Sequence, residues 1–467
     1  MNTELDMQLT SADANIRSNH KTDVILHAFD WPYDLIRERA KEISELGYKT
    51  VLVSPPMKSL KTDSGTQWWQ RYQPQDYRVI DNQLGNTVQF KAMVEELKAY
   101  DLRVYVDVVF NHMANESSIR DDLEYPNHND LRDYAKHKAY FDKQKLFGEL
   151  SQPLFTEDDF EEAFGIEDWK DKWQVQSGRI SGGPSDPGLP TLRANANVVK
   201  QQQNYLLALK DMGVKGFRID AAKHMTLEHL ELVWTEEITE GVHIFGEIIT
   251  DGGATAEEYE IFLEPYLNRT RLGAYDFPLF NTVFEAMAED GSLESLINPY
   301  CFGQALSRMR AITFAITHDI PNNDVFMDLV MDEEMEWLAY AYIMGRDGGV
   351  PLIYTDLDTS GIKDEAGLPR WKDAWRNPKM VAMIAFHNSV HGEVMESISA
   401  TEDTLLFSRG EKGYVALNKA DKGCVFEVKS EQPLYDCLSG KTYQSLNGMV
   451  KVNVDKKSSA MLLSLIT

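Results

Sequence analysis

The sequence predicts a (β/α)8 barrel with a long insertion after its third strand, followed by a C-terminal antiparallel β-domain. Up to residue 394, short apolar segments that we interpret as eight strands alternate with amphipathic helical segments. The segment 103–110 (RVYVDVVF) is apolar almost throughout and rich in β-branched residues, which is typical of parallel strands buried on both faces. The length of 467 residues leaves room for a barrel of about 250 residues and two further domains.

The first half of the barrel shows the alternation most clearly. Its elements are, in chain order, strand 23–30, helix 34–46, strand 50–54, helix 87–100 and strand 103–110. In the first of these helices, Ile36, Ala40 and Ile43 fall on one face, and Gly47 ends it. The apolar stripe of the second helix and the Pro-Pro pair after strand 50–54 support the same assignment.

The alternation resumes with helix 197–212, whose apolar residues again share one face. Five strands follow, at 216–220, 243–247, about 273–278, 311–317 and 349–354.

Three domains are therefore expected. Residues 1–112 and 196–394 form the barrel. Residues 113–195 are rich in charged, aromatic, Gly and Pro residues without a clear period, and form the inserted domain. Residues 395–467 contain short alternating segments such as GYVALN and MVKVNV, which are typical of antiparallel strands.

Charge and composition narrow the classes of partner. The chain has 47 Lys and Arg against 74 Asp and Glu, a net charge of −27, which would repel nucleic acid and anionic membranes. No segment is apolar over the ~20 residues needed to span a bilayer. The N-terminus lacks the pattern of a signal peptide, so we expect a cytoplasmic protein, or a secreted one whose leader has been removed. We also expect a monomer.

Cysteines are too few and too scattered for a disulfide framework or a zinc cluster. They are Cys301, Cys424 and Cys437. Free thiols are the favoured reading for the last two, with a disulfide between them as the alternative.

Carboxylates stand at the ends of several predicted strands, where a barrel of this kind carries its catalytic groups. Asp220 ends the fourth strand and Glu247 the fifth, and Asp319 follows the seventh. Arg218 lies two residues before Asp220, so the two side chains share one face of the strand, and the guanidinium favours the ionised carboxylate. One carboxylic acid and one carboxylate flanking a glycosidic bond are what glycoside hydrolysis requires.

Six short motifs resemble the α-amylase family, glycoside hydrolase family 13. DVVFNH (107–112), GFRIDAAKH (216–224), FGE (245–247) and THD (317–319) resemble its four conserved regions, in the family's order. WWQRYQPQDY (68–77) and GLPTL (188–192) resemble two further stretches of the family, the second near the end of its inserted domain B.

The resemblance implies a retaining, endo-acting hydrolase of α-1,4-glucosidic bonds in starch, glycogen or malto-oligosaccharides. An exo-acting maltooligosaccharide hydrolase and an α-glucan transglycosylase are alternatives with the same carboxylates. A glucan-binding protein without activity is disfavoured, because such proteins typically lose catalytic carboxylates.

Catalytic roles follow from the resemblance residue by residue. Asp220 matches the nucleophile, Glu247 the general acid/base, and Asp319 the carboxylate that stabilises the distorted transition state. Arg218 matches the arginine that keeps the nucleophile ionised. The separation between the carboxyl groups of a retaining pair is about 5–5.5 Å, and the pKa of the acid is raised. Asp107 and Asp276 are expected to be structural.

Substrate contacts are also implied by the resemblance. His112 and His318 match histidines that bind the sugar beside the cleaved bond. Tyr72 matches an aromatic ring that stacks on that sugar, since the apolar faces of sugars suit aromatic rings. The remaining candidates are Trp69 as a glucan platform (its neighbour Trp68 being the other tryptophan of the pair), Gln73 in the wall of the site, and Lys223 with His224 on the leaving-group side.

Calcium is left undecided by the sequence. Asn111 and the backbone carbonyl of His224 match two ligands of the family's calcium site. Thr191 stands where the family usually has an Asp ligand, and nothing in the sequence shows that the nearby Asp186 replaces it. Because calcium prefers carboxylate and carbonyl oxygens, this exchange weakens the expected site. Thr317 stands where chloride-dependent members have Asn, so we expect no chloride site.

Overall fold

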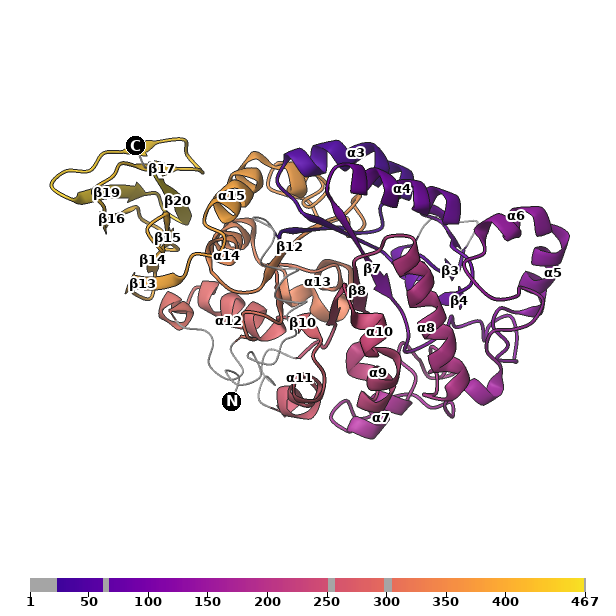
Figure 1. The fold of residues 1–467 in the computed structure, drawn as a ribbon. Coiled ribbons are helices and arrows are strands. Elements are labelled where there is room, and N and C mark those ends of the chain that lie inside the picture. The colour runs from indigo at the N-terminus through magenta and orange to yellow at the C-terminus, as the bar shows by residue number, and fades with distance from the viewer. Residues whose placement is uncertain (1–22, 62–66, 251–256, 298–304, 466–467) are drawn as a thin grey trace.

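Eight parallel strands form a closed barrel at the centre of the molecule (Figure 1). The computed structural model describes residues 23–61, 67–250, 257–297 and 305–465. The prediction of a (β/α)8 barrel is confirmed. Around the barrel the strands follow the order β1 (Ile25–Ala28), β12 (Val350–Thr355), β11 (Ala311–Thr313), β10 (Gly273–Tyr275), β9 (His243–Gly246), β8 (Gly216–Ile219), β7 (Arg103–Val108) and β2 (Thr50–Val53).

Strand β1 closes the barrel because it pairs on both edges. Ile25 lies opposite Thr50 of β2 and opposite Leu352 of β12, with parallel register in both cases. All four residues of β1 are buried, as are those of β2 and β8. Burial on both faces explains the nearly continuous apolar runs in the sequence. Since all eight strands run in one direction, the residues that follow them gather at a single rim.

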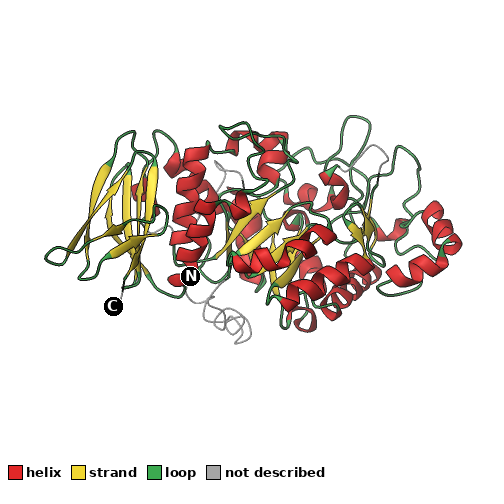
Figure 2. Ribbon diagram, turned by 90° about the horizontal axis from the view of Figure 1, so that it is seen from above, coloured by secondary structure: helices red, strands yellow, loops and turns green. Residues whose placement is uncertain are grey.

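Amphipathic helices surround the strands (Figure 2). Helix α3 (Tyr33–Glu45) buries Ile36, Ala40 and Ile43, as the sequence predicts. Helix α4 (Thr87–Ala99) starts with a capping box, in which Asn86 accepts from the Gln89 amide and the Gln89 side chain accepts from the Asn86 amide. The other long helices are α8 (Ala196–Asp211), α12 (Phe277–Met287), α14 (Glu333–Gly345) and α15 (Pro378–Ser389).

Some elements escape prediction because they are too short to show a period. Four strands of two or three residues form two hairpins before α4, namely β3 (Lys58–Ser59), β4 (Pro74–Asp76), β5 (Asp81–Asn82) and β6 (Gly85–Asn86). In the insertion lie the short helices α5 (His128–Lys136), α6 (Lys138–Gln144) and α7 (Lys172–Ser177). A hydrophobic period needs a window of about 11 residues to be recognised.

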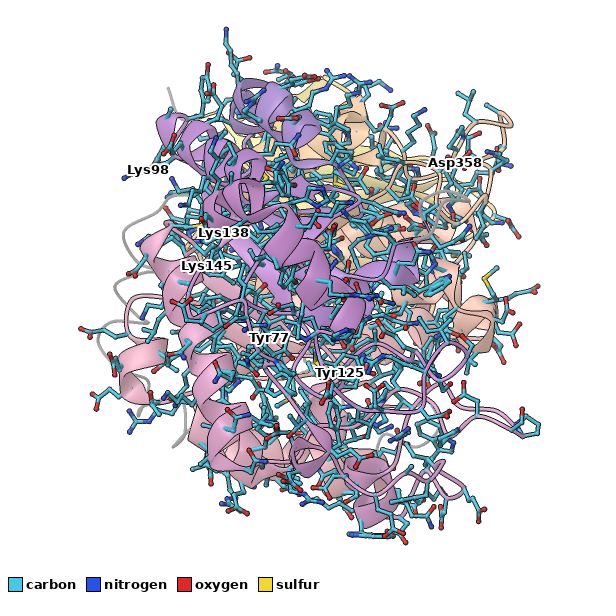
Figure 3. All side chains as sticks on the ribbon, turned by 90° about the vertical axis from the view of Figure 1, so that its right-hand side faces the viewer. Tyr77, Lys98, Tyr125, Lys138, Lys145 and Asp358 are labelled. Carbon is cyan, nitrogen blue, oxygen red and sulfur yellow. The ribbon has the colours of Figure 1, made fainter. Side chains whose placement is uncertain are left out.

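Tyr77 joins the insertion to the barrel and lies in the interior, as does Tyr125 (Figure 3). Its ring stacks on Tyr205 of α8 and meets Phe110 and Phe155 edge-on. Its hydroxyl donates a 2.7 Å hydrogen bond to the carbonyl of Val109. The contact therefore combines apolar packing with satisfaction of a buried backbone acceptor just beyond β7.

After residue 394 the chain forms antiparallel sheets that lie beside α14 and α15 (Figures 1 and 2). The six-stranded sheet has the order β13 (Met395–Ala400), β14 (Thr404–Arg409), β15 (Gly413–Asn418), β20 (Ser458–Ser464), β17 (Leu434–Asp436) and β18 (Thr442–Tyr443). A separate ribbon pairs β16 (Cys424–Lys429) with β19 (Met449–Val454).

The prediction of an antiparallel C-terminal domain is confirmed, and β13 begins at the residue where the sequence changes character. The thiols of Cys424 and Cys437 are free, and Cys301 lies outside the described residues. Within the described part of the chain, no helix is long and apolar enough to cross a membrane.

Replacing Tyr77 by Phe removes only the buried hydroxyl and leaves the carbonyl of Val109 without that donor. We expect the free energy of unfolding to fall by about 1–2 kcal/mol, measured by urea denaturation. The control is Tyr435→Phe, because Tyr435 is 37% exposed. An equal effect of both changes would contradict the role assigned to Tyr77.

Candidate active site

Four carboxyl groups gather at the carboxyl rim of the barrel. Asp107 lies within β7, Asp220 directly follows β8, and Glu247 directly follows β9. Asp319 begins the short helix α13 (Asp319–Asn322), a few residues after β11. All four side chains are largely buried, with exposed fractions between 0% and 17%. The predicted catalytic residues thus come from separate strands and meet in one place.

Arg218 connects these carboxyl groups. Its Nη1 donates to both oxygens of Asp107 at 2.9 and 2.7 Å and to Oδ1 of Asp220 at 2.8 Å. Its Nη2 donates to Oε1 of Glu247 and lies 3.8 Å from Oδ2 of Asp319. Arg218 lies next to the last residue of β8, and its guanidinium is fully buried. A single cation therefore touches all four acids.

The charge balance of this cluster favours bound protons. One guanidinium cannot neutralise four carboxylates, and burial penalises every uncompensated charge. Burial, together with the charge of Asp319, raises the pKa of Glu247 to about 8 against the pull of Arg218. Burial also raises the pKa of Asp220, to about 7, with Arg218 again opposing. Because these groups interact, their protons belong to the cluster as a whole.

A strained backbone turn positions Glu247. Its Oε2 accepts a 3.0 Å hydrogen bond from the amide of Ala221. Ala221 has a φ of 47°, in the left-handed region that residues other than glycine seldom adopt. Such a conformation costs roughly 1–3 kcal/mol and is characteristic of functional sites. The turn after β8 therefore directs a backbone donor at the carboxyl group that follows β9.

Two buried polar atoms point to a missing polar partner. Oδ2 of Asp319 and Nδ1 of His318 make no hydrogen bond to the described residues, although Oδ2 lies 3.4 Å from Nε2 of His318 and 3.8 Å from Nη2 of Arg218. Buried polar groups are seldom left unpaired in a native protein, and each such group calls for an explanation. Their place in the carboxyl cluster suits the hydroxyl groups of a bound sugar.

Aromatic rings form one wall of the site. Tyr72 and His318 stack at a centroid distance of 5.4 Å, and Phe29 also stacks on His318, at 4.6 Å. The hydroxyl of Tyr72 donates to Asp107 at 2.9 Å, and Nε2 of His112 lies 2.9 Å from the carbonyl of Tyr72. Burial lowers the pKa of His112 to about 4 and lowers that of His318 as well, so both rings are neutral near pH 7.

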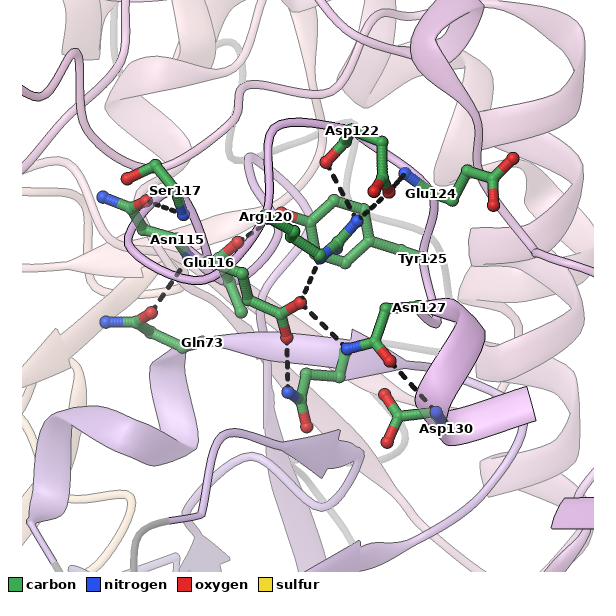
Figure 4. A network of polar contacts seen from close by, with 12 residues as sticks. Gln73, Asn115, Glu116, Ser117, Arg120, Asp122, Glu124, Tyr125, Asn127 and Asp130 are labelled. Atoms are coloured by element: carbon green, nitrogen blue, oxygen red, sulfur yellow. Dashed lines mark hydrogen bonds and ion pairs between the residues drawn. The ribbon is translucent and has the colours of Figure 1, made fainter. Parts of the chain in front are cut away.

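Trp69 and Gln73 lie at the two ends of the 3-10 helix Trp68–Tyr72. The ring of Trp69 is 39% exposed, whereas Trp68 packs edge-on against Tyr72 and His318. The side-chain oxygen of Gln73 accepts from the amide of Asn115 at 3.0 Å (Figure 4). Gln73 therefore ties this wall to the start of the insertion.

A buried carboxylate organises the same part of the insertion. Glu116 accepts hydrogen bonds from Gln75 at 2.5 Å and from Asn127 at 3.0 Å, and it pairs with Arg120 (Figure 4). Arg120 in turn lies 4.4 Å above the ring of Tyr125. The network links the insertion to the hairpin strand β4.

Lys223 and His224 lie in the turn after β8 and are both held by protein partners. The ammonium of Lys223 pairs with Glu258 at 3.1 Å, and its backbone amide donates to the carbonyl of Glu247. His224 uses Nδ1 on the carbonyl of Val175 at 3.0 Å, and its ring meets Trp169 edge-on. The turn thus joins α7 of the insertion to the strand end that carries Glu247.

The residues expected at the calcium site fit that ion poorly. The hydroxyl of Thr191 donates to the carbonyl of Gly178 at 2.8 Å and offers no carboxylate. The nearby Asp186 is engaged by protein donors, since its two oxygens accept from Asn115 at 2.6 Å and from the amide of Gly188 at 3.0 Å. Asn111 is buried and lies beside His112, with its amide nitrogen 3.3 Å from Nδ1. The site therefore lacks the strong ligand that calcium prefers.

Sequence reasoning missed several neighbours of the site. Glu258, Trp169 and Phe29 carry no motif, and their positions follow only from the path of the loops. Asp107 and Asp276 are both buried. Asp276 caps α12 by accepting from the amide of Leu279.

Replacing Glu247 by Gln should stabilise the fold, because it removes one acid from an over-charged cluster. The pKa of Glu247 rises from 4.5 to about 8 on folding, so its ionisation costs stability progressively as the pH rises between these values. We expect Glu247→Gln to raise the free energy of unfolding by about 1–2 kcal/mol above pH 8 and to change it little near pH 4.

Paired denaturation curves at the two pH values check this expectation. Glu237→Gln, on the outer surface, is the control. A stabilisation that is equal at both pH values would contradict the electrostatic origin.

Comparison with known proteins agrees with this geometry. A family model described as "Alpha amylase, catalytic domain" matches residues 34–261. An α-amylase of Aeromonas hydrophila is 49% identical over 399 residues, which cover 85% of this chain and 84% of the relative.

Two crystal structures share the fold. Wild-type α-amylase I from Eisenia fetida aligns over 96% of this chain and 98% of its own, with a TM-score of 0.76 at 21% identity. A mutant of that enzyme in complex with maltohexaose aligns over the same shares, with a TM-score of 0.74 at 21% identity. The motifs, the carboxyl cluster and the 49% identical relative together place the chain in the α-amylase family of glycoside hydrolases, which act on the α-1,4 bonds of starch.

Proposed function

We propose that this chain is a retaining, endo-acting α-amylase that cleaves starch, glycogen or malto-oligosaccharides. The observation that carries the proposal is the position of Asp220 and Glu247 on the two terminal nitrogens of Arg218. A single sugar ring above this guanidinium can meet both carboxyl groups, as a double-displacement mechanism requires.

Asp220 is the nucleophile in this proposal. Its carboxylate attacks the anomeric carbon while Glu247 gives its proton to the departing glycosidic oxygen, which leaves a glycosyl ester on Asp220. Glu247, now ionised, then takes a proton from water, and the resulting hydroxide attacks the anomeric carbon and releases Asp220. The raised pKa of Glu247 supports the first step, since the acid must be protonated near neutral pH.

Asp319 and the two histidines hold the sugar beside the cleaved bond. Oδ2 of Asp319 and Nδ1 of His318 make no hydrogen bond to the described residues and suit its hydroxyl groups, while Arg218 supports Asp319 from 3.8 Å. Tyr72 offers its ring to the apolar face of this sugar, and His112 lies directly behind the Tyr72 backbone. The exposed ring of Trp69 is the platform for glucose units further along the chain, and Lys223 with His224 borders the leaving group.

The first experiment follows soluble starch over time with the wild-type protein and the Asp220→Asn variant. We expect the wild type to release a spread of malto-oligosaccharides with the α-anomeric configuration. The variant should lose at least about 10⁴-fold in kcat, because no nucleophile remains. Product length is read by chromatography and the anomer by NMR.

Other outcomes would replace this proposal. One small product from the start would indicate an exo-acting enzyme, and products longer than a defined oligosaccharide substrate would indicate transglycosylation. Binding of amylose without turnover would indicate a glucan-binding protein.

We also propose that calcium binds weakly, because Thr191 offers no carboxylate to it. In zinc-free buffer, we expect a calcium chelator to leave both starch hydrolysis and the thermal midpoint unchanged. Thr191→Asp restores the family's usual ligand and should make the thermal midpoint calcium-dependent. The expected gain in the free energy of unfolding is about 2.7 kcal/mol when calcium exceeds its Kd 100-fold. Loss of stability of the wild type on chelation would contradict weak binding.

A further inference from the structure

Three potential metal ligands meet near the amino end of the barrel, opposite the carboxyl rim. Asp23 lies two residues before β1. His387 lies in the last turn of α15, and His391 lies two residues beyond that helix. The cluster therefore joins the segment that enters the first barrel strand to the last barrel helix.

The three side chains point their ligand atoms at one another. Nε2 of His387 lies 2.7 Å from Oδ1 of Asp23, and Nε2 of His391 lies 3.2 Å from Oδ2. All three ligand atoms lie within 4.8 Å of each other. In a tetrahedral zinc site the ligands lie about 2.0–2.1 Å from the ion and hence roughly 3.3 Å apart. Small rotations of the side chains would bring this cluster to that spacing.

The hydrogen bond behind His387 suits a metal ligand. Its Nδ1 lies 3.0 Å from the carbonyl of Met344 in α14. A carbonyl only accepts, so Nδ1 donates to it. Nε2 faces Oδ1 of Asp23, which also accepts, so a metal ion at Nε2 would take the place of the proton shared between these two atoms. Metal-bound histidines are typically oriented by such a contact on the other nitrogen. His387 is 5% exposed, whereas His391 and Asp23 are 25% and 22% exposed, so an ion can enter from solvent.

We propose that Asp23, His387 and His391 bind one divalent transition-metal ion of the zinc type. Two imidazoles and one carboxylate favour zinc, nickel or copper over calcium and magnesium, which prefer oxygen ligands. Three protein ligands leave a fourth position for water.

Binding would fasten the start of β1 to α15 and so link the first strand of the barrel to its last helix. The positive charge of Arg409 also faces His391 and opposes a bound cation. Its guanidinium is occupied by the backbone carbonyls of Glu393, Gly345, Arg346 and Val390. The Asp23 carboxylate therefore supplies the charge that favours the ion.

Zinc titration of the metal-free protein at mildly alkaline pH tests the proposal, since both imidazoles must be neutral to bind. We expect one zinc ion that is lost in His391→Gln, with a rise in the thermal midpoint that depends on zinc. The Gln side chain can still donate to Asp23, so the hydrogen bond survives while the ligand is removed. Affinity should fall by more than the 10- to 100-fold that loss of an outer-shell partner costs.

His137→Gln is the matched control, because His137 also pairs with an aspartate, Asp133, but belongs to no group of three potential metal ligands among the described residues. It should leave zinc binding unchanged. Cobalt(II) provides a second readout, as its visible spectrum reports coordination by nitrogen ligands. Zinc binding that survives in both His391→Gln and Asp23→Asn, or no binding by the wild type, would overturn the proposal. In that case the cluster is a hydrogen-bonded clasp only. None of these readouts depends on activity toward starch.

Discussion

The buried guanidinium of Arg218 is the interaction on which the active site depends. It lies inside the barrel near the end of β8 and touches one acid within β7 and three acids that follow β8, β9 and β11. Without it, four buried carboxyl groups would repel one another and take up protons. With it, the cluster still holds more acids than one cation can neutralise, and burial together with the charge of Asp319 keeps the pKa of Glu247 raised against the pull of Arg218. The closed barrel makes this arrangement possible, because the strand register fixes the position of each acid around the guanidinium.

The insertion completes the site on its open side. Tyr77 packs it onto the barrel, and Glu116 anchors its first loop through neutral and charged hydrogen bonds. Where Thr191 replaces a calcium ligand, it donates to a backbone carbonyl instead. These contacts of Tyr77, Glu116 and Thr191 bind the insertion to the barrel and order its loops.

The two ends of the barrel serve different purposes. The carboxyl rim carries the strained turn at Ala221, unpaired polar atoms and raised pKa values, which are marks of function that reduce stability. The amino end carries Asp23 and His387, where the first strand meets the last helix. In this fold the carboxyl rim generally carries the chemistry, and features of the opposite rim generally concern stability.

The sequence by itself determined the order of strands and helices, the C-terminal β-domain and the acids at the strand ends, because hydrophobic periodicity and strand alternation are local properties. Only the tertiary structure decided which groups meet. Asp107 becomes a partner of Arg218 and Tyr72, Lys223 is tied to Glu258, and Asp23 reaches His387 across 364 positions of sequence. Such contacts depend on loop paths and on the closure of the barrel, and neither leaves a periodic signal in the chain.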